Sequence, residues 1–259
     1  MPTSPATAPA APRTAPIQDD PVSYLREVQA RARALSKYRL TLYRQERLGL
    51  FQTLGPLERI AVTFRADPFS VRLVWDDPDS QLYESVFIAG PGHGKLVVRE
   101  RKGWLTFPPT VRWLDPADPV RWRRSKRPIT EFGLAATMDR TLSIIEDAPV
   151  GAPVQITYTG IEMVPRVDRQ AHHFVLIRAT TPETPCPRQD LWIDTETDLP
   201  TGTALTLPDG RLDALYLFAD ITPDESIGEQ DFRMDMPGAA APAPVGPAGS
   251  ADTDIRRRP

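Results

Sequence analysis

A glycine-rich run at residues 90–95, GPGHGK, has the composition of a loop that wraps a phosphate. A P-loop requires glycine, four residues, and then glycine, lysine and a hydroxyl residue, because its backbone N–H groups surround the phosphates and the hydroxyl reaches the magnesium ion. Counted from the last glycine and the lysine of this run, the first glycine position holds Ala89 and the hydroxyl position holds Leu96. The residues on both sides have strand character, and no helical pattern follows. The run is therefore predicted to be a hairpin turn whose glycines supply positive φ.

The remaining candidates for metal or nucleophilic chemistry are three histidines, His93, His172 and His173, and one cysteine, Cys186. Neighbouring residues in a strand point to opposite faces, so the adjacent pair cannot easily bind one metal, and zinc sites use three or four ligands. We expect one of the pair to face the core and the other to face water. The lone cysteine lies between two prolines and is predicted to be an exposed loop thiol without a catalytic role. No HExxH or GxSxG motif occurs, so we expect no enzyme activity, no metal and no cofactor.

Two acidic clusters occur at residues 76–79 and 194–198. The second resembles the start of a calcium loop, but the glycine and glutamate positions that an EF-hand requires hold Leu199 and Leu205. Either cluster would act as an acid–base pair only if the fold placed carboxylates across a cleft. We interpret both as turns at strand ends.

The strongest charge pattern is RWRRSKR at residues 121–127, where five of seven side chains are Arg or Lys and Trp122 lies among them. Basic groups beside an indole suit the phosphates of a lipid headgroup, an anionic membrane surface or nucleic acid. The net charge of -3 argues against a dedicated nucleic-acid binder, which would be strongly basic. A solvated surface loop is the alternative interpretation. The candidate contacts to an anionic group are Arg121, Arg123, Arg124 and Arg127.

The chain before this run predicts one helix followed by about five strands. Asp20 can cap a helix that has Pro21 at its first position, and apolar residues then recur at helical spacing. From Tyr38 the period changes to two, and Gly-Pro and Asp-Pro turns separate the segments, as in an antiparallel meander. In each of these strand segments the apolar residues share one face. Six of them are Leu42, Val62, Phe64, Val71, Leu73 and Trp75.

After a basic, proline-rich loop that ends at Pro128, Thr130 can cap a second helix with an apolar stripe. Beyond Pro149 the strand pattern resumes for about five more strands. This order excludes the parallel layers of α/β folds. It predicts an α+β fold, a strongly curved antiparallel half-barrel of about ten strands with two helices on its concave side and a built-in cavity.

The ends of the chain differ from its middle in composition. The proline- and alanine-rich residues 1–18 and residues 237–259 lack the apolar side chains that offset the entropy of ordering, so both are predicted to be disordered. Residues 19–236 then form a single domain. No apolar run is long enough to span a membrane, and no secretory signal is visible at the start.

Several segments together resemble the DUF1571 family, which is allied to the outer-membrane lipoprotein carrier group typified by LolA. They are YRLTLYRQERLG, LERIAVTFRADPFSVRLVW, GPGHGKL and RPITEFGL. The C-terminal segment LWIDTETDLPTGTALTLPDGRLDALYLFADI is similar to the end of LolA-like chains. The resemblance implies a half-open β-barrel that binds or carries a lipid or acyl chain without enzymatic chemistry, at the periplasm or cell envelope. Because no signal peptide is visible, a cytoplasmic location stays as an alternative.

The six same-face apolar residues are then candidate cavity residues, and the basic run would meet an anionic headgroup at the mouth or a membrane surface. The alternative is an interaction module with a closed core and a protein partner. A carrier should keep an open apolar pocket of at least several hundred cubic ångströms, whereas an interaction module should have none and should carry any exposed apolar patch on its outside.

Overall fold

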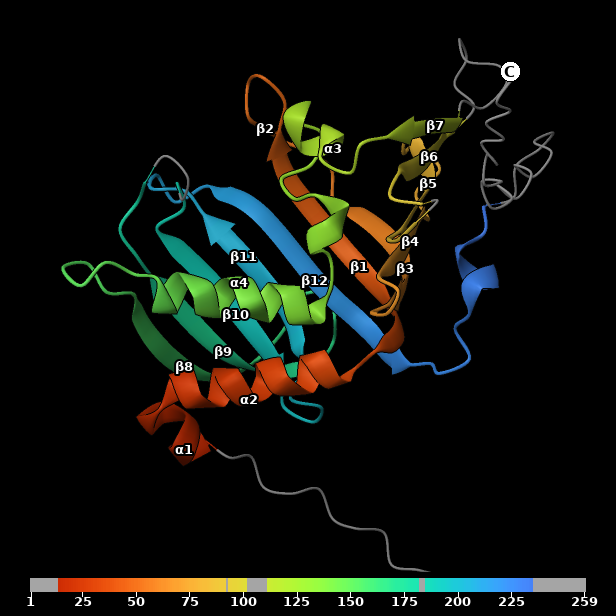
Figure 1. Ribbon diagram of the computed structural model, residues 1–259. Helices are drawn as coiled ribbons and strands as arrows, with labels where there is room; N and C mark the ends of the chain where they lie inside the picture. Colours follow the sequence, from red (N-terminus) through yellow and green to blue (C-terminus); the bar gives the residue numbers. More distant parts are fainter. Residues whose placement is uncertain (1–13, 92, 102–110, 182–184, 235–259) are drawn as a thin grey trace, which may run out of the picture.

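The computed structural model describes residues 14–91, 93–101, 111–181 and 185–234 of the 259-residue chain (Figure 1). Most of the two predicted disordered tails lies outside these residues. Within the N-terminal tail, however, the structure has a short helix, α1 (Thr14–Asp19), whose Ile17 is buried. The ordered part of the chain therefore begins before the predicted boundary at Asp19.

The described residues form one antiparallel sheet of 12 strands, which confirms the predicted curved half-barrel. The strands are β1 (Lys37–Leu48), β2 (Thr53–Leu54), β3 (Glu58–Arg65), β4 (Ser70–Trp75), β5 (Leu82–Ile88), β6 (Leu96–Glu100), β7 (Val111–Leu114), β8 (Gln155–Met163), β9 (Gln170–Ile177), β10 (Arg188–Asp194), β11 (Pro200–Thr206) and β12 (Leu212–Pro223). Their order across the sheet is β7-β6-β5-β4-β3-β1-β12-β11-β10-β9-β8, with β2 paired to β1 outside this path. The two predicted meanders thus meet where β1 pairs with β12.

The sheet is curved, and the regular pairing between its strands is interrupted in two places. The β1–β12 register shifts between Arg39 and Thr41, where Asp220 has φ 54, and the β8–β9 register shifts at Gly160, where φ is 112. Such bulges bend a strand and increase its twist. Figure 1 shows the result: β3 to β7 turn away from the plane of β8 to β12, and the sheet partly encloses its concave side.

Two long helices, α2 (Pro21–Ala34) and α4 (Leu134–Glu146), lie next to each other on the concave side, as predicted (Figure 1). The side chain of Asp20 accepts a hydrogen bond from the backbone N–H of Ser23 at 3.0 Å, so the predicted cap of α2 is confirmed. None of the helices in the described part of the chain is long and apolar enough to cross a membrane.

The predicted cap of α4 by Thr130 is wrong. Thr130 lies inside a 3-10 turn, η1 (Ile129–Glu131), and the residue that precedes α4 is Gly133. The backbone N–H of Leu134 donates instead to the hydroxyl of Tyr38 on β1, at 3.1 Å. A sheet residue 96 positions earlier in the chain therefore satisfies one of the free N–H groups at the start of α4.

The segment between β7 and α4 is more ordered than the predicted loop. It contains a short helix, α3 (Asp118–Arg121), and then η1, and it crosses in front of the sheet (Figure 1). At the other end of the chain, η2 (Glu229–Phe232) packs behind β4 and β5 on the convex side. Segments outside the strands thus cover parts of both faces of the sheet. The strand pattern of the sequence does not predict where these segments pack.

The glycine-rich run is a hairpin turn, as predicted. β5 pairs with β6 antiparallel, and Phe87 lies opposite Leu96. Gly90 and Gly94 have φ values of 119 and 87, in the region that favours glycine. The phosphate-loop interpretation is thereby excluded.

Candidate ligand-binding site

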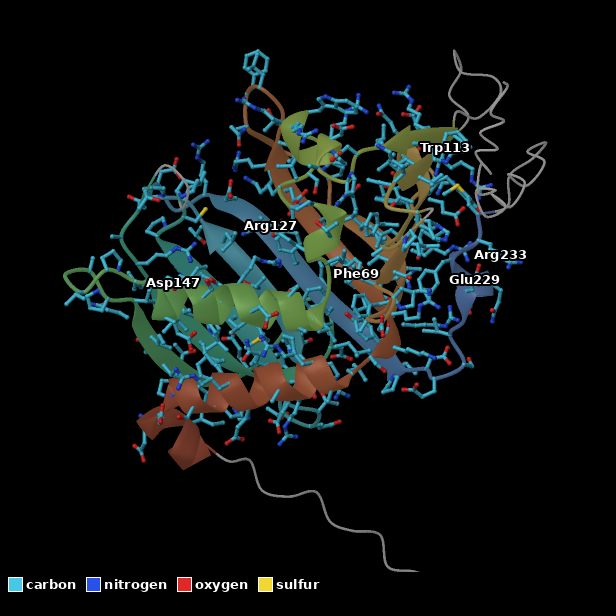
Figure 2. All side chains as sticks on the ribbon, in the orientation of Figure 1. Phe69, Trp113, Arg127, Asp147, Glu229 and Arg233 are labelled. Carbon is cyan, nitrogen blue, oxygen red and sulfur yellow. The ribbon has the colours of Figure 1, made fainter. Side chains whose placement is uncertain are left out.

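A hollow opens on the concave side of the sheet, bounded by α4 and by the segment of residues 115–133. Its cavity volume is about 190 Å³, which is less than the several hundred cubic ångströms expected of a carrier. Its apolar lining comes from Leu42, Leu73, Trp75, Leu82, Leu96, Val98, Leu114, Trp122, Ile129, Phe132, Ile144, Leu205 and Phe218. Figure 2 labels Arg127 above α4, on the side of the sheet that carries this hollow. The interior is therefore mostly apolar with a charged margin, which is the usual character of a small-molecule site.

The six predicted cavity residues divide into two groups. Leu42, Leu73 and Trp75 line the hollow. The others, Val62, Phe64 and Val71, do not line it, and all six are buried in the core that packs beneath the helices. The ring of Phe64 stacks on Tyr38 with centroids 4.6 Å apart, so helices and aromatic rings cover its part of the strand face.

The four arginines predicted to contact an anion also fall into two groups. Arg124 and Arg127 line the hollow. Arg121 lies outside it and pairs with Asp118 at 3.1 Å. Arg123, with φ 54, is exposed, and its carbonyl accepts a hydrogen bond from the backbone N–H of Gly49. The basic run therefore turns only part of its charge toward the hollow.

The basic run is anchored to the sheet through Lys126, which points inward. Its ammonium group donates to Oδ1 of Asp213 at 2.7 Å, and its backbone N–H donates to Oε1 of Glu46 at 3.3 Å. The hydroxyl of Tyr216 donates to the same Glu46 oxygen. Because Asp213 and Glu46 are buried, these contacts fix the height of the loop above β1 and β12.

The predicted exposure of Cys186 is wrong, since the thiol is buried and donates to Oδ2 of Asp213 at 3.3 Å. Burial, followed by the charge of Asp213, raises the pKa of Cys186 to about 12. A thiol with such a pKa is almost wholly protonated at neutral pH, and the protonated form is a poor nucleophile. The cysteine therefore belongs to the network that anchors the loop.

Six arginines and three glutamates line the hollow: Arg44, Arg112, Arg124, Arg127, Arg140, Arg178, Glu46, Glu100 and Glu131. Arg44 pairs with Glu58 at 2.7 Å, outside the hollow, and Arg112 pairs with Glu100 at 3.4 Å. Burial, followed by the charge of Arg127, lowers the pKa of Arg140. The margin thus carries an excess of positive charge.

His172 and His173 point to opposite faces of β9, but the prediction that one of them faces water is wrong. His172 is buried on the concave side against Tyr24, with ring centroids 5.6 Å apart. His173 is buried on the convex side, where it stacks on Trp192 at 5.2 Å and its Nε2 lies 3.0 Å from Oδ1 of Asp190. In the described part of the chain, no three His, Cys, Asp or Glu side chains are placed to hold a metal ion.

The two acidic clusters are turns, as interpreted from the sequence. Oδ1 of Asp194 accepts hydrogen bonds from the backbone N–H groups of Glu196 and Thr197. Oδ1 of Asp77 accepts from the backbone N–H of Asp79. Neither cluster lines the hollow.

The carboxylate of Asp190, on the convex side of the sheet, should make the stability of the fold sensitive to acid. Burial alone would raise its pKa, but hydrogen bonds from Arg188 and His173 outweigh burial and lower it to about 2. Since the folded-state pKa lies below the unfolded value of 3.8, the carboxylate stabilises the fold fully above about pH 4, and the stabilisation is lost as pH falls toward 2. We expect a contribution of about 1–2 kcal/mol at neutral pH.

Urea unfolding of the wild type and Asp190→Asn at several pH values between 7 and 2 measures this contribution. The difference in unfolding free energy between the two proteins should be largest at neutral pH and should shrink through pH 4 to 2. A difference that stays constant with pH would contradict the role of the carboxylate charge.

Sequence reasoning missed the walls of the hollow that come from the second half of the chain. These are mainly α4 with Thr137, Arg140, Thr141 and Ile144, and β10 to β12 with Gln189, Thr203, Leu205, Tyr216 and Phe218. Tyr216 and Phe218 alternate along β12, and β12 pairs with β1, which carries Leu42. This alternation could have predicted that both residues line the hollow. The arginines on α4 and after β9 carry no such signal.

Comparison with known proteins identifies the family. The profile described as "Protein of unknown function (DUF1571)" matches residues 35–240. Among curated proteins, none matches the chain.

Solved structures with a similar course of the chain include MucB, with 14% identity, a TM-score of 0.48, and coverage of 83% of this chain and 62% of MucB. The MucA/MucB complex of Pseudomonas aeruginosa has 15% identity, a TM-score of 0.47, and coverage of 83% and 61%. A LolA superfamily protein of Nitrosomonas europaea has 11% identity, a TM-score of 0.33, and coverage of 82% and 97%. This chain thus spans about three fifths of the MucB chains. The family match covers most of the chain, as the sequence segments predicted, and the protein belongs to the DUF1571 family.

Proposed function

We propose that the protein binds a hydrophobic ligand, a lipid or an acyl chain, in the hollow of its half-barrel and carries or senses it without changing it chemically. The observation that supports the proposal is the hollow itself. A sheet whose apolar face were meant only for packing would be filled by side chains at close-packed density. Here Leu42, Leu73 and Trp75 line the hollow, although each is buried and belongs to the same core cluster as the residues beneath the helices.

The apolar lining of the hollow suits a hydrophobic group. It runs from β6 and β7 at one side, under the segment of residues 115–133, to α4 and β11. Burying a methylene group of a ligand there gains about 0.8 kcal/mol. An acyl chain of ordinary length therefore has enough apolar surface to bind with micromolar affinity after the cost of association.

Filling the hollow tests the proposal. Leu205, on β11, lines the hollow and is only half-buried, so Leu205→Trp places an indole into open space with little overpacking. We expect Leu205→Trp to weaken the binding of a fluorescent fatty acid at least about tenfold, or about 1.4 kcal/mol. Fluorescence titration and native mass spectrometry of the protein with the fatty acid measure this effect.

The matched control is Ile161→Trp, the same kind of enlargement at a half-exposed strand position outside the hollow. It should bind the fatty acid as the wild type does. Equal binding by both variants would place the ligand elsewhere on the protein. No binding by the wild type, together with no lipid carried from the native host, would overturn the proposal.

A protein-interaction module is the second candidate function. Leu50 and Phe51, at the turn between β1 and β2, are 77% and 88% exposed, and Trp122 next to them in the fold is 52% exposed. Large apolar side chains exposed together mark interaction surfaces more often than chance positions do. A wild type that binds no fatty acid, but whose self-association or partner binding is lost in Phe51→Ser, would favour this function.

The compartment is part of the proposal. The resemblance to outer-membrane lipoprotein carriers favours the cell envelope or periplasm. Fractionation of the native host with an antibody to the protein tests this placement, and recovery in the cytoplasm alone would overturn it.

A further inference from the structure

Three of the six arginines that line the hollow make no ion pair with a carboxylate of the described residues. They are Arg124, Arg127 and Arg178. A fourth, Arg140, makes a long ion pair of 3.6 Å with the carboxylate of Glu131 and donates from Nη1 to the backbone carbonyl of Glu131 at 2.9 Å. Arg124 and Arg127 are exposed to solvent, whereas Arg178 is partly buried, and a buried guanidinium group usually pairs with an acid because unpaired charge in a low-dielectric region is costly.

Arg178 lies just after β9 and is held by the backbone. Its N–H donates to the carbonyl of Pro187, and its Nε donates to the carbonyl of Cys186 at 3.0 Å. Its Nη1 is buried and has no hydrogen-bond partner among the described residues. A buried donor that is left unpaired costs about 1–3 kcal/mol, so this atom indicates a place for an acceptor.

Arg127 brings further positive charge to the same wall. Burial is the first cause that lowers the pKa of Arg178 and of Arg140, and the charge of Arg127 lowers both further. Arginine stays protonated at neutral pH, so the partly buried Arg178 and Arg140 keep their positive charge beside the hollow. The ion pair of Lys126 with Asp213 anchors the loop that carries Arg127.

Two carboxylates border this wall and are already engaged. Glu131 contacts Arg140, and Oε1 of Glu46 accepts from Tyr216 and from the backbone N–H of Lys126. The other oxygen of Glu46 and the side-chain oxygen of Gln189 are buried acceptors without a partner among the described residues. A hydroxyl or water beside an anion would satisfy them.

We infer that Arg127, Arg140 and Arg178 form a site for an anionic group inside the hollow. The ligand is then an amphiphile whose carboxylate or phosphate binds these arginines while its chain lies along the apolar wall of Leu42, Leu73 and Trp75. The planar guanidinium fork is suited to both groups, which it binds through two parallel hydrogen bonds. This inference rests on the proposed function and makes its ligand class more specific.

The test compares ligands that share one chain and differ in the head: laurate, dodecyl phosphate and 1-dodecanol, titrated by displacement of a fluorescent fatty acid. We expect the two anions to bind at least about tenfold tighter than the alcohol, since hydrogen bonds to charged groups exceed neutral ones by that order. The stronger of the two anions identifies the head as carboxylate or phosphate. Inorganic phosphate alone should bind far more weakly, because it lacks the chain.

Arg178→Gln and Arg127→Gln should each remove most of the preference for the two anions over dodecanol. Arg178→Lys keeps the charge without the fork and should retain part of the preference. The control is Arg121→Gln, which alters an exposed arginine of the same basic run outside the hollow and should bind all three ligands as the wild type does. Thermal unfolding of each variant confirms that the fold is kept.

Equal affinity for the three ligands would overturn the anion site and leave the carrier function standing. Binding of none of them by the wild type would overturn both. Binding of inorganic phosphate as tight as that of dodecyl phosphate would overturn the amphiphile and leave a plain anion site.

Discussion

Glu84→Ala is expected to lower the free energy of unfolding by about 3–5 kcal/mol, because it removes one side of a buried ion-pair network. The carboxylate of Glu84 is fully buried on β5. It accepts from Nε of Arg72 at 2.7 Å through one oxygen and from Nη2 of Arg99 at 2.6 Å through the other. Without it, two guanidinium groups would share a covered region with no carboxylate between them.

The covering element explains why this pair is costly to break. Arg72 also donates from Nη1 to the backbone carbonyl of Asp231 at 3.2 Å, in the η2 segment that packs on the convex side. Val86, the next residue on the same face, packs against Ile227 and Phe232 of that C-terminal segment. Losing Glu84 should therefore also loosen the contact between η2 and the sheet.

Urea denaturation of Glu84→Ala measures the loss, and limited proteolysis followed by mass spectrometry locates any opening near residues 224–234. The control is Asp76→Ala, which breaks the exposed pair of Arg59 and Asp76 and should cost less than about 1 kcal/mol. A Glu84→Ala loss as small as the control would show that the arginines find other partners.

Much of the fold could be predicted from the sequence because it depends on local signals. Alternation of period two marks a strand with one covered face, and Asp20 followed by Pro21 marks a helix start. Both signals act within a few residues, so β1, β3, β4 and α2 form where they were expected. The glycines of the hairpin between β5 and β6 acted in the same local way.

The candidate site could be predicted only in part, because its walls come from segments far apart in the chain. The period-two alternation marks Leu42 and Phe64 alike, as residues on the apolar face of a strand. It does not say which of them a helix covers. The burial of Cys186 and of both adjacent histidines was missed for a related reason. Side chains from other strands contact them, such as Asp213 at Cys186 and Trp192 at His173, and no local pattern reports such contacts.

Arg178 shows the same limit for the charge pattern. Clustered charge in the sequence drew attention to residues 121–127, but only Arg124 and Arg127 of the four predicted contacts line the hollow. The arginines on α4 and after β9 stand singly among other residues in the sequence. The fold brings them together, so a charge run is a poor guide to where charge accumulates in space.

Phe64→Ala is the prediction that separates core from hollow, and we expect it to lower the free energy of unfolding by about 3–5 kcal/mol. Phe64 is nearly buried, stacks on Tyr38 and meets the edge of Phe69 with centroids 5.6 Å apart. Removing its ring leaves a cavity beneath the start of α4, where the Tyr38 hydroxyl also binds Leu134. Such a cavity collapses poorly because the stacked rings around it are held by both the sheet and the helix.

Leu205→Ala is the matched truncation in the wall of the hollow. Leu205 already borders open space, so its loss should cost only about 1 kcal/mol and should instead enlarge the binding space. Urea denaturation of both variants and titration with fatty acids of different chain lengths measure the two effects: Phe64→Ala should change stability most, and Leu205→Ala should change the preferred chain length. Equal losses of stability would mean that the hollow closes in solution and that its walls pack as a core, which would remove the observation on which the carrier function rests.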